Sequence, residues 1–449
     1  MATGAFLEQG LSLDAFSKAS DLQKRLLFTF MALFVYRIGT YVPLPGLDPA
    51  IIADVASKHL SGSGFLATIN AFSGGALGRM TIFALNLMPY ISASIMIQLF
   101  TMISPTLEAL KKEGEMGRKK INQYTRYLAI FVCSFQAYAA CMWLMSLPNG
   151  PVVIGSIFPL IAVPSLVCGT MFLVWLGEQI TSRGVGNGVS LLIFAGIVAN
   201  MPASVANVLE LGRAGALSLM SVITIFAIAL AVIVFVVYIE RAQRKVAINY
   251  PQRQAMMAQG KMMGNMGGSH LPLKINVSGV IPPIFAYALI GPVAIAASYL
   301  FNNLHLDAAG YIMGILSDQG GIELSLILVA LIIFFSFFYT AVVFNPTETA
   351  DNLKKAGGYI PGVRPGQATA EYLDYILTRL TTVGALYMSL VCLIPSIMYK
   401  KFGIHFIFSG TGILIVVGVT MDTITQIYTH VLSHQYRGIL RKANKKLQQ

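Results

Sequence analysis

The sequence predicts an all-α protein that crosses a membrane many times. Three observations support this prediction: hydrophobic residues make up 56% of the 449 residues, charged residues make up 11%, and the apolar residues gather in long runs with few charges. The charged share is less than half of that in a typical soluble domain. Runs of about 20 apolar residues are long enough to span a bilayer as helices. The composition therefore excludes a soluble enzyme and a disordered chain.

Ten candidate spans follow one another along the chain. Each is an apolar run of 17 to 27 residues with few charges, which is the length that a membrane-spanning helix requires. They are Leu26–Val42, Met80–Ser104, Tyr124–Leu147, Ile154–Ile180, Val189–Ala206, Leu217–Ile239, Val277–Phe301, Ile322–Phe344, Ile376–Met398 and Phe406–Tyr428. Ile332 in the eighth span is expected to face lipid. An even number of spans places both termini on the same side of the membrane.

The distribution of basic residues selects that side. Of the 31 lysines and arginines, 25 lie in the segments on the side of the termini or at the span ends that border them. Only five lie on the other side, and Arg37 lies within the first span. Cytoplasmic segments of membrane proteins are enriched in Lys and Arg. We therefore expect a multi-pass protein with both termini in the cytoplasm.

Ten spans divide into two halves of five. An odd number of spans per half makes the halves run in opposite senses, as in proteins built from inverted repeats. The expected halves are residues 1–216, with spans one to five, and residues 217–449, with spans six to ten. The sequence shows no internal repeat, so the inversion is an expectation from topology.

Three segments depart from the pattern of simple spans. The apolar stretch Phe65–Leu77 is too short to cross a membrane and has glycines at both ends, including Gly74 and Gly75. It is either a short helix that dips into the membrane or an amphipathic helix on the outer surface, and few of its groups are expected to anchor it. The long loops 240–276 and 345–375 are polar, basic and rich in glycine, which makes them candidates for a docking surface.

The sequence lacks common catalytic motifs. It contains no GxxxxGK[ST], GxSxG or HExxH pattern, so ATP hydrolysis and proteolysis are not supported. No cofactor or metal is expected, because His430 and His434 lack an evident third ligand and the four cysteines have no CxxC spacing. A secondary transporter for small solutes remains an alternative, since inverted halves and basic inner loops are also typical of transporters. Sparse charge at mid-membrane and the long loops argue against it.

Several motifs give the chain a resemblance to a known family. The segment Ala84–Gln98, with the sequence ALNLMPYISASIMIQ, resembles the second-span signature of the SecY/Sec61-alpha family, which forms the channel of the Sec protein translocase. The similarity continues in the same order along nearly the whole chain. The further motifs are KKEGE at 111–115, WLGEQI at 175–180, GNG at 186–188, HLPLK at 270–274, FNP at 344–346, ETADNLKK at 348–355 and PGVRPG at 361–366.

The resemblance implies a fold and a function. The fold is ten spans in two inverted five-helix halves around an hourglass pore, with a lateral opening to lipid. The function is a passive channel in the bacterial inner membrane that passes unfolded secretory polypeptides and releases transmembrane segments sideways into the bilayer. The stretch Phe65–Leu77 is then the plug, which favours the dipping helix over the surface helix. Its named residues are Phe65, Ile69, Phe72, Gly74 and Gly75.

The resemblance also assigns site residues by motif. The pore ring falls on Leu87, Ile91, Val189, Ile193, Ile284 and Ile415, and the lateral gate on Ser92, Gln98 and Asn276. Docking of SecA or a ribosome falls on Arg241, Arg244, Lys245, Arg253, Lys354, Lys355 and Arg364. A narrow apolar ring repels ions yet offers no polar group that would hold a passing polypeptide. Asn86 departs from the family, in which Gly is common at this position, so the packing there is not transferred.

The implied partners supply what a passive channel lacks. SecE and SecG complete a heterotrimeric channel, and SecA supplies ATP hydrolysis. A translating ribosome, the signal sequences of preproteins and the lipid bilayer are further partners, and the resemblance extends the set to SecD/SecF and YidC.

Overall fold

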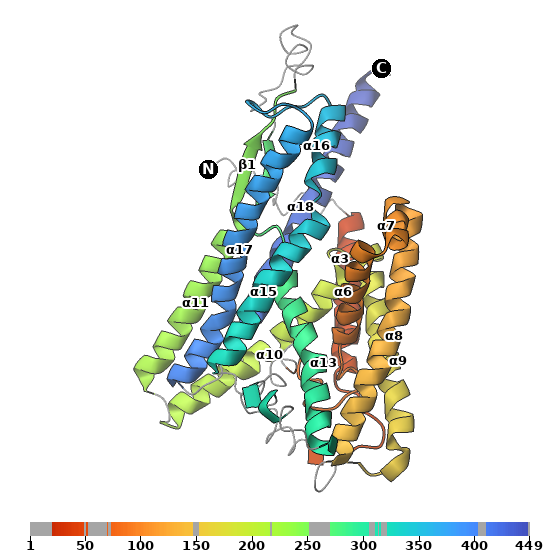
Figure 1. The fold of residues 1–449 in the computed structure, drawn as a ribbon, viewed down its shortest axis with the longest axis vertical. Helices are drawn as coiled ribbons and strands as arrows, with labels where there is room; N and C mark the ends of the chain where they lie inside the picture. Colours follow the sequence, from red (N-terminus) through yellow and green to blue (C-terminus); the bar gives the residue numbers. More distant parts are fainter. Residues whose placement is uncertain are drawn as a thin grey trace. The chain divides into compact units, whose positions relative to one another are not determined.

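The computed structural model of the chain is mostly helical (Figure 1). It describes residues 20–48, 51–52, 70, 73–146, 152–215, 218–250, 270–304, 310–312, 314–315, 321–402 and 410–447. The chain forms two compact units. The first comprises Met1–Ala214, Ala288–Gln319 and Ile407–Gln449, and the second comprises Gly215–Tyr287 and Gly320–Phe406. The expected inverted halves 1–216 and 217–449 rest on the number of predicted spans and stay a prediction.

The first unit is a bundle of long helices. Helices α6, α8 and α9 pack side by side, α10 packs against α9 and α18, and α3 packs against α9 (Figure 1). Leu44, Leu144, Phe158 and Leu166 belong to its buried apolar core. The bounds are α3 Ser20–Gly39, α6 Met88–Ile103, α7 Pro105–Lys112, α8 Glu115–Ser146, η1 Gly155–Ile157, α9 Phe158–Arg183, α10 Gly188–Arg213 and α18 Gly410–Leu447.

The second unit combines helices with a small β-hairpin. Helices α15 and α17 pack along each other, and α16 packs against α17. Strands β1 and β2 pair antiparallel, with Gln243 opposite Lys274 and Ala247 opposite His270. The bounds are α11 Leu219–Arg241, β1 Gln243–Ala247, β2 His270–Lys274, α15 Ile322–Val343, α16 Pro346–Lys355 and α17 Gln367–Phe402. Helix α13, Ile281–Leu304, begins in this unit and continues into the first.

The main part of each expected span falls on a helix. Among the described residues, seven helices are long and apolar enough to cross a membrane, and the bent pair α6 and α7, with an angle of 100°, would make an eighth. The two remaining expected spans correspond to α3 and α13. Ten crossings are consistent with this arrangement, and the number itself stays a prediction.

The second span begins later than its hydropathy indicates. The expected start is Met80, whereas α6 begins at Met88. Met80 and Asn86 have positive φ angles of 43° and 49°, a left-handed conformation that a helix cannot contain. Pro89 lies in the first turn of α6, where its fixed φ suits a helix start. Hydropathy alone does not distinguish this run of turns from a helix.

The expectation that Ile332 faces lipid is wrong. Its side chain is fully buried, on a helix that packs against α17. Leu326 of the same helix is 63% exposed and Ile327 is 42% exposed. Helix α15 is apolar on all sides, so its sequence carries little contrast between a packed face and a lipid face.

Candidate functional site

The described end of the predicted plug is a sequence of tight turns. Phe65, Ile69 and Phe72 lie outside the described residues, whereas Gly74 and Gly75 lie within them. These two glycines have φ angles of +67° and +82°. Positive φ angles at two successive positions favour glycine at both, because a side chain would strain the backbone there.

This end of the predicted plug is anchored, contrary to the expectation from sequence. The carbonyl oxygen of Gly74 accepts hydrogen bonds from Arg37 Nη1 at 3.2 Å and from Arg79 Nη2 at 2.9 Å. The Asn200 amide on α10 donates to the carbonyl oxygen of Asn70 at 3.3 Å. Two of these contacts join residues far apart in the chain, Arg37 with Gly74 and Asn200 with Asn70, and no local pattern indicates them.

The predicted pore-ring residues are placed on three elements of the first unit and one of the second. Leu87 directly precedes α6, Ile91 lies in its first turn, Val189 and Ile193 lie at the start of α10, and Ile415 lies on α18. Helices α10 and α18 pack against each other, which brings two of these elements together. Ile284 lies on the part of α13 that belongs to the second unit. Leu87, Ile91, Ile193 and Ile415 are buried, whereas Val189 and Ile284 are partly exposed.

Asn86 is explained by its backbone. It has a φ of +49° and its side chain is buried beside the start of α6. Asn is among the few residues other than Gly that adopt the left-handed region readily. The backbone conformation at this position therefore suits Asn as well as Gly.

The motif from Gly186 to Gly188 forms the corner between α9 and α10. Gly186 N donates to Gln426 Oε1 of α18 at 2.9 Å. At the same corner, Val185 N donates to Thr29 Oγ1 of α3 at 3.1 Å. A Cβ atom on Gly188 would overlap the backbone of Gly177. The contacts of α3, α9, α10 and α18 at this corner fix the start of α10, where Val189 and Ile193 lie.

The predicted gate residues lie in two different environments. Ser92 Oγ on α6 donates to the carbonyl oxygen of Met88 at 3.1 Å and approaches that of Ala288 on α13 at 3.4 Å. Gln98 donates to Ser94 Oγ at 3.3 Å, within α6. The contact from Ser92 to Ala288 thus joins the second and seventh expected spans.

Asn276 holds the loop before α13. Its amide donates to Glu240 Oε1 at 2.7 Å and to the carbonyl oxygen of Gly279 at 3.0 Å, and its Oδ1 accepts from Ser278 Oγ at 3.2 Å. These bonds connect the end of α11 with the start of α13. Asn276 is buried, and its three hydrogen bonds fix the turn between these two helices.

The two long basic loops fold together into one body, which we call the two-loop platform: β1, β2, α16 and residues 357–366. Val246 and Leu273 from the first loop share a buried cluster with Ile360 from the second and Leu373 of α17. Asn249 and Tyr359 exchange two backbone hydrogen bonds of 2.9 and 3.0 Å. The sequence predicted both loops as docking candidates but not their joint core.

The platform carries the predicted docking cations on its surface. Five of them lie on the platform and are exposed, namely Arg244, Lys245, Lys354, Lys355 and Arg364. Arg241, the last residue of α11 just before β1, is exposed as well. Arg253 lies outside the described residues. Asn345 Oδ1 caps α16 by accepting from the backbone of Thr347 at 3.1 Å, with Pro346 at the first helical position, so the Phe344–Pro346 motif forms a helix start.

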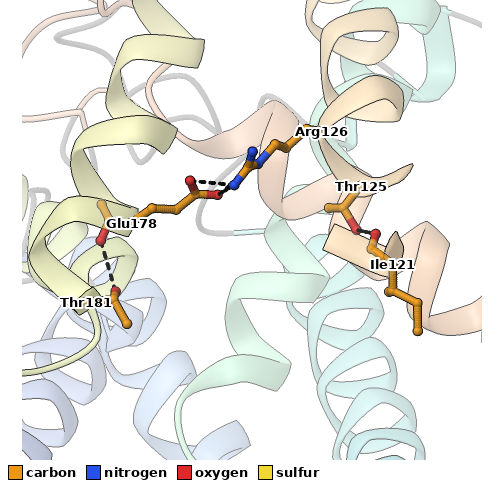
Figure 2. A network of polar contacts seen from close by, with 6 residues as sticks. Ile121, Thr125, Arg126, Glu178 and Thr181 are labelled. Carbon is orange, nitrogen blue, oxygen red and sulfur yellow. Dashed lines mark hydrogen bonds and ion pairs between the residues drawn. The ribbon is translucent and has the colours of Figure 1, made fainter. Parts of the chain in front are cut away.

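An ion pair that the sequence did not single out joins α8 to α9. Arg126 binds the Glu178 carboxylate at both oxygens, with Nη2 2.6 Å from each and Nε 2.9 Å from Oε1 (Figure 2). Figure 2 also shows Thr181, whose hydroxyl lies near the start of α10 and accepts from Gly188 N at 2.9 Å. Glu178 belongs to the WLGEQI motif, but nothing in that motif identifies Arg126 as its partner.

The long apolar helices define a multi-pass membrane protein. A family model described as SecY matches residues 81–424. The chain is 49% identical over 436 residues to the protein translocase subunit SecY of Vibrio cholerae, covering 96% of this chain and 97% of that protein. It is 48% identical over 430 residues to that of Escherichia coli K12, covering 95% of each. The chain belongs to the SecY family.

Solved structures support the same fold. A protein conducting channel aligns with a TM-score of 0.64 and 18% identity, covering 92% of this chain and 93% of that one. Sec61 in a canine ribosome-channel complex aligns with a TM-score of 0.61, 17% identity and the same coverage. The chain therefore has the fold of these channels.

Proposed function

We propose that the chain is the central channel subunit of a Sec translocon. It passes unfolded secretory polypeptides across the bacterial inner membrane and releases transmembrane segments sideways into lipid. The observation that carries this proposal is the sequence identity of 49% and 48%, over nearly the full length, to two proteins named as translocase subunit SecY. The fold shared with protein-conducting channels supports it independently of sequence.

Each part of the site has a proposed role in this channel. Residues 65–77 are the plug, the six aliphatic residues named above form the pore ring, and Ser92, Gln98 and Asn276 line the lateral gate. The contact of Ser92 with Ala288 supports the gate, because an interhelical polar contact of about 1 kcal/mol is weak enough for a signal sequence to replace.

The platform is the proposed docking site for partners outside the membrane. Its described docking cations are exposed and its two loops share one core, so it offers a positively charged surface on a packed body. SecA, which hydrolyses ATP, and a translating ribosome dock here. SecE and SecG complete the channel, and SecD/SecF and YidC work beside it.

Reconstitution tests the proposal. Vesicles that contain the chain with SecE and SecG should protect a preprotein from external protease when SecA and ATP are present. Vesicles without the chain are the control. Uptake of a small solute driven by an ion gradient, without SecA or preprotein, together with no preprotein protection, would favour a secondary transporter instead.

A further inference from the structure

Two arginines reach the same backbone oxygen at the described end of the plug. Arg37 comes from the last turn of α3, and Arg79 follows the turn that contains Gly74. Their guanidinium nitrogens lie 3.2 and 2.9 Å from the carbonyl oxygen of Gly74. A carbonyl oxygen has two lone pairs, so these two donors saturate it. The turn is thereby tied to α3.

The aromatic ring of Tyr41 stabilises the neighbouring positive charges of Arg37 and Arg79. The Cζ atoms of Arg37 and Arg79 lie 5.0 and 4.1 Å from the ring centroid of Tyr41. Arg37 Nη2 also donates to the Tyr41 hydroxyl at 3.0 Å. Two guanidinium groups repel each other, whereas the face of an aromatic ring attracts each of them. Tyr41 therefore offsets the repulsion and orients both donors.

The same turn is pressed against α10. A Cβ atom on Gly74 would lie 3.2 Å from Gly196 Cα, so only glycine allows this approach without a shift. The Asn200 amide binds the carbonyl oxygen of Asn70, and Gly75 N donates to that same oxygen at 2.9 Å. The turn thus has α10 on one side and the two arginines at its carbonyl oxygen.

We infer that Arg37 and Arg79 are positioning residues that latch the turn 73–79 in place through the Gly74 carbonyl oxygen. The role of this latch rests on the proposed function, in which the turn is the end of the plug. The acceptor is neutral, and guanidinium groups bind carboxylates more strongly than they bind neutral oxygens. The latch is therefore reversible, which a plug that must move requires.

Hydrogen exchange in the complete channel complex tests the latch. Arg37→Gln combined with Arg79→Gln should speed exchange of the amides from Gly75 to Arg79 about tenfold to a hundredfold, the factor that hydrogen bonds to charged groups typically carry. Arg37→Lys, which retains the charge with fewer donors, should give a smaller increase. Arg213→Gln is the matched control, because it removes an exposed cation from the last turn of α10.

The outcomes separate the latch from the proposed function. Unchanged exchange in the double variant overturns the latch, and so does faster exchange spread over all helices, since the arginines would then support the fold in general. If the double variant does not fold, Tyr41→Leu, which alters a side chain that is 55% exposed, should produce the same local increase. Resting conductance in planar bilayers is measured in parallel. Faster local exchange without added conductance supports the latch and contradicts the plug role of this segment.

Discussion

A Cβ atom on Gly188 would overlap the carbonyl oxygen of Gly177. The backbone at the start of α10 is therefore in direct contact with the backbone of α9. Thr181 Oγ1 links the two helices, because it donates to Gly177 O at 2.9 Å and accepts from Gly188 N at 2.9 Å. A Cβ atom on Gly177 would lie 3.3 Å from Val189 Cγ2. The position of Val189, a proposed pore-ring residue, depends on the absence of side chains at both glycines.

Gly188→Ala is expected to push α10 away from α9. Overpacking of this kind costs about 1–3 kcal/mol, and the shift moves Val189 out of the proposed ring. Thermal unfolding should show lower stability, and bilayer conductance should rise at rest. Gly314→Ala is the control, because a Cβ atom there would meet nothing within 4 Å. Equal losses in the two variants would contradict the role of the close contact.

Asn86 provides a test of backbone conformation. Asn86→Gly and Asn86→Ala remove the same amide group, so their difference isolates the left-handed φ of 49°. Ala in this conformation costs about 1–2 kcal/mol more than Gly. The glycine variant should therefore unfold at the higher temperature. Indistinguishable melting temperatures would show that the turn relaxes without cost.

The ion pair of Arg126 and Glu178 is expected to contribute modestly to stability. The side chains are 43% and 33% exposed, so solvent screens the pair, and its coupling energy should be about 0.5–1 kcal/mol. A double-mutant cycle with Arg126→Ala and Glu178→Ala measures it from the free energies of unfolding. Strictly additive losses would mean that the two residues act independently despite their bidentate contact.

Polar replacements in the pore ring should make the resting channel leak. Ile284→Asn and Ile415→Asn wet the constriction and weaken the closed state by about 1–3 kcal/mol per site, which raises the open population about fivefold to a hundredfold. Planar-bilayer conductance measures the leak. Ile327→Asn on α15 is the appropriate control, since Ile327 is 42% exposed whereas Ile332 is buried. Wild-type conductance in folded ring variants would show that these residues do not seal the pore.

Arg364 is expected to be essential for docking. It is exposed between Gly362 and Gly366, whose φ angles are +83° and +108°, and its carbonyl oxygen accepts from Thr369 Oγ1 at 2.9 Å. The charge therefore projects from a fixed turn. Arg364→Glu should strongly reduce SecA-driven protection of a preprotein while complex assembly stays normal. Lys274→Glu on β2 is the control. If Arg364→Glu retained full preprotein protection while Lys274→Glu reduced it, the docking surface would lie on another face of the platform.

The sequence predicted the spans well because long apolar runs have few other structures available in a bilayer. It misplaced the start of α6, because the turns before Met88 are as apolar as the helix that follows. It also misplaced Ile332, because α15 has no polar face to orient it. The motifs indicate the regions of the proposed site, whose roles stay predictions, and local signals such as Asn345-Pro346 predict a helix start.

Contacts between distant residues could not be predicted in this way. Arg37 and Gly74 are 37 residues apart in the chain, and Arg126 and Glu178 are 52 residues apart. Cations near span ends are common in membrane proteins, so the sequence does not distinguish Arg37 or Arg79 from an ordinary interfacial residue. Such contacts emerge only when the helices are packed.

The shared core of the two-loop platform has a mechanical consequence. Its first loop continues directly from α11 at Arg241, its second follows α15 after Val343, and its buried cluster includes Ile376 of α17. A force applied near Arg364 is therefore distributed over the three helices α11, α15 and α17. A partner that docks on the platform, as proposed above, would therefore transmit its force to all three helices.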